Sequence, residues 1–143
     1  MAQVQKVIRK FDYSDLDLDF IPHPTTKDVV KKTGVYAIQR ALRNLILTNF
    51  YDRPFRPGIG SNAQKILFDN INPLTATYLK NAIKEVINNF EPRIQLIDEA
   101  AYGLNNIDVQ VDPDNNGYLV KITFIIVNRA EPVSVTVFLE RIR

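Results

Sequence analysis

The strongest constraint on the fold is a change of hydrophobic period close to Glu91. The helical segments expected between residues 33 and 90 have apolar residues at helical spacing, whereas from Ile94 onward the apolar residues recur with a period of two. The first pattern is typical of helices with one buried face, and the second is typical of half-buried strands. Helices followed by a run of strands indicate an α+β domain. We therefore expect an α+β fold in which an N-terminal arm and helices pack on a C-terminal antiparallel β-meander or hairpin.

Two helices are expected before residue 70. Thr33 is a candidate N-cap for a helix that runs to about Thr48 with its apolar residues on one face. Ser61 and Gln64 have the spacing of a capping box, in which each side chain bonds to the backbone of the other residue. This spacing predicts a short helix over residues 62–68.

The clearest helix follows Asn72. This residue is a candidate N-cap, and Pro73 suits the first helical position. Pro92 disfavours helical backbone at Glu91, so the helix should end there. One continuous apolar stripe marks its buried face: Leu79, Ala82, Ile83, Val86, Ile87 and Phe90.

Three strands are expected after this helix. The first covers residues 107–111 and leads into a turn at residues 112–117, which is rich in Asp, Asn, Pro and Gly. Two longer strands over residues 118–127 and 133–142 should pair as a terminal hairpin, about 118–142. Residues 112–117 also resemble the start of a calcium loop, but the glutamate needed at its end is absent, so a β-turn is expected.

The chain has the length of one domain, with 143 residues. Acidic and apolar residues alternate within residues 1–26, which suits an extended arm on a surface. We therefore expect an N-terminal arm over 1–26 and a single α+β domain over 27–143. The one histidine, His23, lies between two prolines and is expected to be a loop residue.

The composition argues against several classes of function. Without cysteine there can be no disulfide or thiolate metal site, and one histidine cannot form a histidine-rich site, so we expect no metal and no cofactor. A net charge of +2 gives no basic bias towards nucleic acid, and no apolar stretch is long enough for a membrane span. A Gly-x-Gly-x-x-Ala match at residues 58–63 follows a proline-rich loop rather than a strand. We expect no catalytic residue, and hence no enzyme.

The last strand has an edge that nothing later in the sequence can cover. A long β-branched edge strand is a hazard unless it is shielded or used to pair with another chain. Pairing with a partner and shielding by the arm at 1–26 both remain open. The candidate partner-binding residues on this strand are Val133, Val135, Val137, Leu139 and Arg141.

Three ordered segments resemble the phage baseplate wedge and sheath-initiator family, which type VI secretion baseplates share and some of whose members are labelled tail lysozymes. These segments are residues 37–48, residues 52–61 and the run Phe90-Glu91-Pro92-Arg93-Ile94. The resemblance implies a structural subunit of a contractile phage tail baseplate. It also implies a place in the virion tail baseplate and assembly in the cytoplasm of the bacterial host.

The resemblance implies two kinds of partner contact. Glu91, Pro92 and Arg93 correspond to the family signature that docks on the helical core bundle of neighbouring wedge proteins, and Arg53 and Pro54 are assigned to the same contact. The terminal strands would pair with the tail sheath protein and so nucleate sheath assembly. The tail tube or hub region is a further candidate partner.

Three alternatives remain open. Glu91 and Arg93 could form an internal salt bridge at the junction between helix and strand, rather than present an acceptor and a bidentate donor to a partner. The chain could be a peptidoglycan-cleaving tail lysozyme. It could also be the equivalent baseplate subunit of a bacterial type VI or other contractile injection system.

Overall fold

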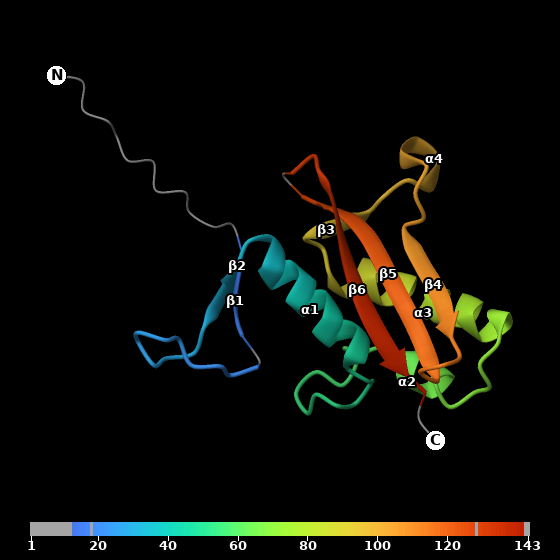
Figure 1. Cartoon of the computed structure of the whole chain (residues 1–143), viewed down its shortest axis with the longest axis horizontal. Helices are drawn as coiled ribbons and strands as arrows, with labels where there is room; N and C mark the ends of the chain where they lie inside the picture. Colours follow the sequence, from blue (N-terminus) through green and yellow to red (C-terminus); the bar gives the residue numbers. More distant parts are fainter. Residues whose placement is uncertain (1–12, 18, 128, 142–143) are drawn as a thin grey trace. The chain divides into compact units, whose positions relative to one another are not determined.

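A computed structural model describes residues 13–17, 19–127 and 129–141. The chain divides into two compact units, Met1–Ile38 and Gln39–Arg143, and each is described by itself (Figure 1). Helix α1 (Val35–Leu47) runs across the boundary between them. The division into an arm and a domain at residue 26 stays a prediction.

The first unit contains a small antiparallel pair of strands. β1 (Ser14–Leu16) pairs with β2 (Lys31–Thr33), and Ser14 lies opposite Thr33. The predicted N-cap at Thr33 is therefore wrong, because this residue ends a strand. Gly34 follows with a φ of 61°, which a glycine adopts without strain, and the helix begins after it. Residues 1–12 of the predicted arm lie outside the described residues.

The second unit is built on a four-stranded antiparallel sheet with β5 (Gly117–Ile126) at its centre. β6 (Pro132–Glu140) pairs along one side of β5 over almost its whole length. On the other side, β4 (Ile107–Asp112) lies beside the first part of β5 and β3 (Ile94–Leu96) beside its end. The predicted α+β class and the antiparallel meander are confirmed (Figure 1).

Helix α3 (Pro73–Phe90) forms as its sequence predicts. The Asn72 side chain accepts a hydrogen bond of 2.8 Å from the Thr75 N–H, and Pro73 occupies the first turn. The helix ends at Glu91, whose N–H donates to the Ile87 carbonyl. α3 packs on the sheet at β4 and lies behind the strands in Figure 1.

The short helix predicted at 62–68 exists as α2 (Ala63–Ile66), but its capping box does not. The Ser61 hydroxyl accepts from the Ala63 N–H and donates to the Ile46 carbonyl at 2.7 Å. The Gln64 side chain accepts from the Asn49 amide instead of returning to Ser61. Both side chains connect α2 to the end of α1, so a tertiary contact replaces the local one.

The alternation of β5 places one whole row of its side chains in the core. Its even-numbered residues are all apolar and at most 1% exposed, as their spacing of two predicts. The apolar stripe of α3 and the apolar residues of β6 complete this core. The other buried apolar residues of the second unit include Leu42, Leu45, Ile46, Leu79, Ile83, Val86, Ile87, Ile94, Ile107, Val137 and Leu139.

Tyr118 carries a polar atom into this core. Its side chain is fully buried, and its hydroxyl has no hydrogen-bond partner among the described residues. Leaving such a group unpaired costs stability, so Tyr118→Phe should raise the free energy of unfolding by about 1 kcal/mol. Urea denaturation followed by circular dichroism measures this change. A fall in stability would mean that the hydroxyl is bonded in solution.

Candidate partner-binding sites

The register of β6 decides which backbone groups face outward. The Thr123 N–H donates to the Asn106 carbonyl at 2.8 Å, on the side of β5 away from β6. Its partner Ser134 is therefore in a non-hydrogen-bonded pair, and such pairs alternate along antiparallel strands. The backbone groups bonded to β5 are those of Val133, Val135, Val137 and Leu139. Those facing the outer edge belong to Ser134, Thr136, Phe138 and Glu140.

This outer edge is open over much of its length. The Gln39 side-chain amide donates to the Ser134 carbonyl at 2.8 Å, which covers one position. Within the described part of residues 39–141, no hydrogen bond reaches the outward groups of Thr136, Phe138 or Glu140. Shielding by residues 1–12 of the arm lies outside the described residues. Among the described residues of the second unit, a row of N–H and C=O groups therefore has no partner, and such groups can pair with another strand.

The β6 residues predicted for this contact have backbone groups that face β5 rather than the outer edge. Val137 and Leu139 are each 2% exposed and belong to the core, while Val133 and Val135 are half-buried. Arg141 is bonded within the chain, through its N–H to the Asn116 carbonyl and through Nη2 to Asn70. The open backbone groups of β6 belong to the residues between the predicted ones, and partner binding by this strand stays a prediction.

Glu91 and Arg93 form a closed ion pair. The guanidinium Nε and Nη2 donate to the two carboxylate oxygens at 2.5 and 2.6 Å, a bidentate arrangement. Glu91 is 5% exposed, whereas the Arg93 side chain is 33% exposed. The Arg93 carbonyl also accepts from the Val127 N–H at the end of β5. The pair joins the end of α3 to the sheet, as the internal alternative requires, and the exposed part of Arg93 lies beside exposed Pro92.

Arg53 and Pro54 lie on an exposed loop between α1 and α2, which we call the aromatic loop (Asn49–Ser61). A parallel bridge between its two end residues closes the loop, and the Ser61 N–H donates to the Thr48 carbonyl at 2.8 Å. The most exposed aromatic side chains of the described chain, Tyr51 and Phe55, belong to this loop. No sequence pattern distinguished either of them as a candidate binding residue.

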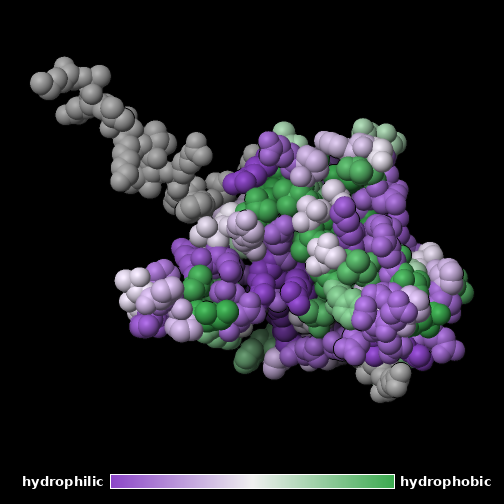
Figure 2. Space-filling model, viewed as in Figure 1, coloured by the Kyte–Doolittle hydropathy of each residue, from purple (hydrophilic) through white to green (hydrophobic). Residues whose placement is uncertain are grey.

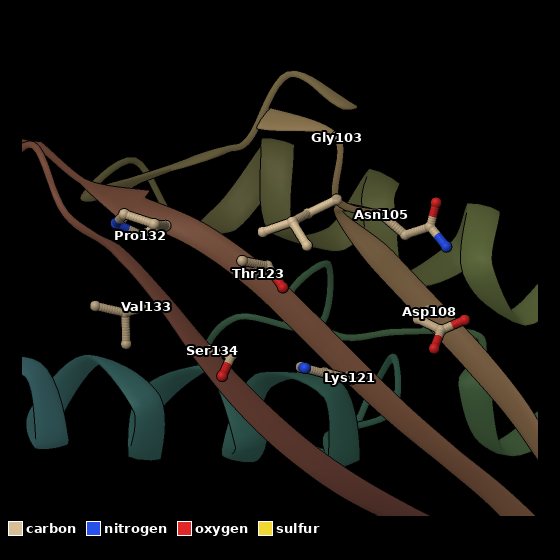
Figure 3. Close-up of a pocket in the computed structure, with 9 residues that line it drawn as sticks. Gly103, Asn105, Asp108, Lys121, Thr123, Pro132, Val133 and Ser134 are labelled. Carbon is tan, nitrogen blue, oxygen red and sulfur yellow. The ribbon is translucent and has the colours of Figure 1, made fainter. Parts of the chain in front are cut away.

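A cavity of about 450 Å³ lies over the sheet, between β6 and the segment that follows α4 (Glu99–Tyr102). Figure 3 shows Asp108 and Lys121 lining it from the neighbouring strands β4 and β5. Asp108 is the one carboxylate in this lining, and it accepts from the Gln110 amide. Glycoside hydrolysis uses two carboxylates that flank the substrate, so this cavity does not match that chemistry.

Two carboxylates have pKa values shifted by structural hydrogen bonds. The Asn106 N–H and then Lys80 lower the pKa of Glu99, which accepts from them at 3.2 and 3.3 Å. The side chain and the N–H of Asn115 lower the pKa of Asp112 in the turn between β4 and β5. Both groups fix local backbone, and in the described residues no three His, Cys, Asp or Glu side chains group as metal ligands would.

Figure 2 shows hydrophobic and hydrophilic surface interspersed on the face from which the sheet is viewed. Leu119 and Phe138, which are opposite each other on β5 and β6, are 38% and 41% exposed, and Lys121 and Thr136 lie beside them. No helix of the described chain is both long enough and apolar enough to cross a bilayer.

Comparison with known proteins gives three kinds of match. A family model described as "Baseplate wedge protein gp25" matches residues 33–127. The baseplate wedge protein gp25 of Enterobacteria phage T4 is 30% identical over 133 residues, which are 93% of this chain and 90% of that protein.

Two solved structures have a similar fold. The baseplate of the anti-feeding prophage contains a chain with a TM-score of 0.58 and 21% identity, covering 92% of this chain and 87% of that one. A putative tail lysozyme from Geobacter sulfurreducens gives a TM-score of 0.57 and 21% identity, covering 72% of this chain and 88% of that one. At such identities the likeness shows the fold alone.

Proposed function

The chain belongs to the baseplate wedge protein gp25 family, and we propose that it is a non-enzymatic subunit that connects the baseplate wedge of a contractile phage tail to the first sheath subunits. It docks on a helical core bundle formed by neighbouring wedge proteins, and it nucleates the sheath by strand pairing at β6. It assembles in the cytoplasm of the bacterial host. The equivalent subunit of a type VI or other contractile injection system would use the same two contacts.

The open edge of β6 is the observation that carries this proposal. Thr136, Phe138 and Glu140 present consecutive outward N–H and C=O groups with no partner among the described residues. An extended segment of a sheath subunit can continue the antiparallel ladder there, with backbone bonds for affinity and side chains for register. β6 is itself fixed by its long pairing with β5, so it offers a rigid template.

The second contact is proposed at the junction of α3 and β3. Pro92 is exposed and Arg93 is partly exposed, while the buried Glu91 carboxylate holds the guanidinium in one orientation. A guanidinium held in this way can meet acidic or carbonyl groups on a helical bundle at a small cost in side-chain entropy. Arg53 and Pro54 on the aromatic loop are proposed to contact the same bundle.

Thr136→Pro tests the role of the edge. The Thr136 N–H faces outward, so proline there removes a donor to the partner without removing a bond to β5. We expect the variant to fold and to join baseplates at wild-type levels, while the number of sheath-bearing baseplates falls at least about tenfold. Electron microscopy of assemblies made in a strain lacking the wild-type protein measures both quantities.

Thr136→Ala is the matched control, because it also removes the threonine hydroxyl but keeps the backbone N–H. It should support sheath assembly as the wild type does. If Thr136→Pro also supports normal sheath assembly, the strand-pairing part of the proposal is wrong. If the wild-type chain releases fragments from purified peptidoglycan in a turbidity assay, the non-enzymatic part is wrong.

A further inference from the structure

We propose that the aromatic loop is a preformed plug that inserts Tyr51 and Phe55 into an apolar pocket rimmed by carboxylates on a neighbouring baseplate protein. This inference rests on the proposed function, since it takes the partner from the same baseplate. It adds a third kind of contact to the backbone pairing at β6 and the docking at Arg93: side chains buried in a pocket.

Exposure is the first reason. Tyr51 is 83% exposed and Phe55 is 98% exposed, so neither contributes to the core of this chain. Exposed aromatic side chains leave apolar surface in water unless a partner covers them. Tyrosine and arginine are also enriched among the residues that dominate binding energies at interfaces. Arg53 lies between the two aromatic residues in sequence, and Arg56 follows them.

The loop is held in one conformation before any partner binds. The Tyr51 N–H donates to the Pro57 carbonyl at 3.0 Å, and the Arg56 N–H donates to the Arg53 carbonyl at 3.1 Å. The Asp52 carboxylate accepts from the Asn49 N–H at 2.8 Å. Bonds that cross the loop in this way reduce the conformational entropy that binding would otherwise cost.

The backbone of Tyr51 supplies a third reason. Its φ of 72° lies in the left-handed region, where a bulky residue is strained and glycine is not. Since the side chain is mostly exposed, packing within this chain does not explain why tyrosine stands here. Strained residues of this kind gather at functional sites. A role of the aromatic ring in binding would account for it.

The charges of the loop indicate the chemistry of the partner. Arg53 and Arg56 are exposed and make no ion pair with any residue that the structure describes, while the one acidic group of the loop, Asp52, is engaged by Asn49. The loop is therefore cationic as well as aromatic. A pocket with two or more carboxylates at its rim would match both guanidinium groups.

A second copy of this chain fits less well. The cavity next to the loop measures about 160 Å³ and is lined by Phe50, Val86 and Phe90 among others. It contains a single carboxylate, Glu85, which could not offset two guanidinium groups. A different protein of the baseplate is the occupant that the charges favour.

The test compares Phe55→Ser and Tyr51→Gly with Phe68→Ser, which removes a 57% exposed aromatic ring outside the loop. Each purified full-length chain is added to baseplate wedges assembled without it, and the bound fraction is measured over a range of concentrations. We expect an apparent Kd at least about tenfold weaker for Phe55→Ser and Tyr51→Gly, and no change for Phe68→Ser. Tyr51→Gly removes the strain, so it should be no less stable than the wild type.

Charge and partner identity are tested on the same wedges. Arg53→Glu combined with Arg56→Glu should weaken binding more than Arg53→Gln combined with Arg56→Gln, and added salt should reduce wild-type binding. A photo-crosslinking residue at position 55 should join the chain to another wedge protein near its Asp or Glu residues. Crosslinks to a second copy of this chain would overturn the inference. It would also be overturned if the wild-type chain floated with anionic vesicles and Phe55→Ser did not.

Two results distinguish failure of this inference from failure of the proposed function. If the wild-type chain joins the wedges and Phe55→Ser joins them equally well, the loop has no such role and the proposed function stands. If the wild-type chain does not join the wedges, the proposed function fails and the inference fails with it.

Discussion

Replacing Glu91 by alanine should lower the free energy of unfolding by about 3 kcal/mol. The carboxylate is 5% exposed and makes both of its short bonds to Arg93, so its removal takes a bidentate ion pair away from a guanidinium next to the core. Breaking a buried pair by removing one partner typically costs about 3–5 kcal/mol, and the partial exposure of Arg93 places this case at the lower end. Chemical denaturation of wild type and variant gives the difference directly.

A double-mutant cycle with Arg93→Ala isolates the energy of the pair. If the two residues act mainly on each other, the double variant should lose clearly less stability than the sum of the single variants. Additive losses, or a loss below about 1 kcal/mol for Glu91→Ala, would contradict the internal role given to the pair.

The same pair can be tested for docking without loss of the fold. Replacing both Glu91 and Arg93 by methionine keeps much of the volume and removes both charges, which is often neutral for stability. We expect this variant to fold but to join baseplates poorly, because the oriented guanidinium is gone. If it joins them as the wild type does, the pair only fixes the junction of helix and sheet.

Gly60→Ala should lower the free energy of unfolding by about 2–3 kcal/mol. A Cβ atom at this position would lie 2.4 Å from the Asn49 carbonyl carbon and 2.5 Å from the Phe50 nitrogen. These are backbone atoms at the closed base of the aromatic loop, so they cannot turn aside as a side chain would. Overpacking of this kind costs about 1–3 kcal/mol, and the displaced bridge between Asn49 and Ser61 adds to it.

Gly58→Ala is the control within the same loop. A Cβ atom there would meet nothing within 4 Å. We expect its stability to stay within about 0.5 kcal/mol of the wild type. Equal effects of the two substitutions in thermal or urea denaturation would show that the close approach at Gly60 does not fix the loop.

The sequence was most informative where one periodic pattern was long and ended in a clear signal. α3 has Asn72, Pro73 and Pro92 at its two ends, and every even-numbered residue of β5 is apolar, so both were predicted closely. The strand β3 and the helix α4 are too short to show a period. Thr33 was misassigned because its pairing with Ser14 depends on residues far away in the chain.

The candidate sites were predicted less completely, for two physical reasons. Alternation shows which side chains of β6 face the core, but the open backbone groups belong to the intervening residues, and the register with β5 is needed to see this. For the loop, proline and glycine predicted irregular backbone, but exposure of Tyr51 and Phe55 is a tertiary property. The run Glu91-Pro92-Arg93 did indicate paired charges, and the structure shows that they pair with each other.

The pairing of β6 has a mechanical consequence for a machine that contracts. All 9 residues of this strand lie opposite residues of β5 in an antiparallel ribbon. Tension applied along the strand axis would strain the whole set of cross-strand bonds together, in shear, whereas tension at right angles would peel them apart singly. An anchor of this form resists most strongly when the pull runs parallel to the strand, so the direction in which a bound neighbour is drawn away should govern how firmly it is retained.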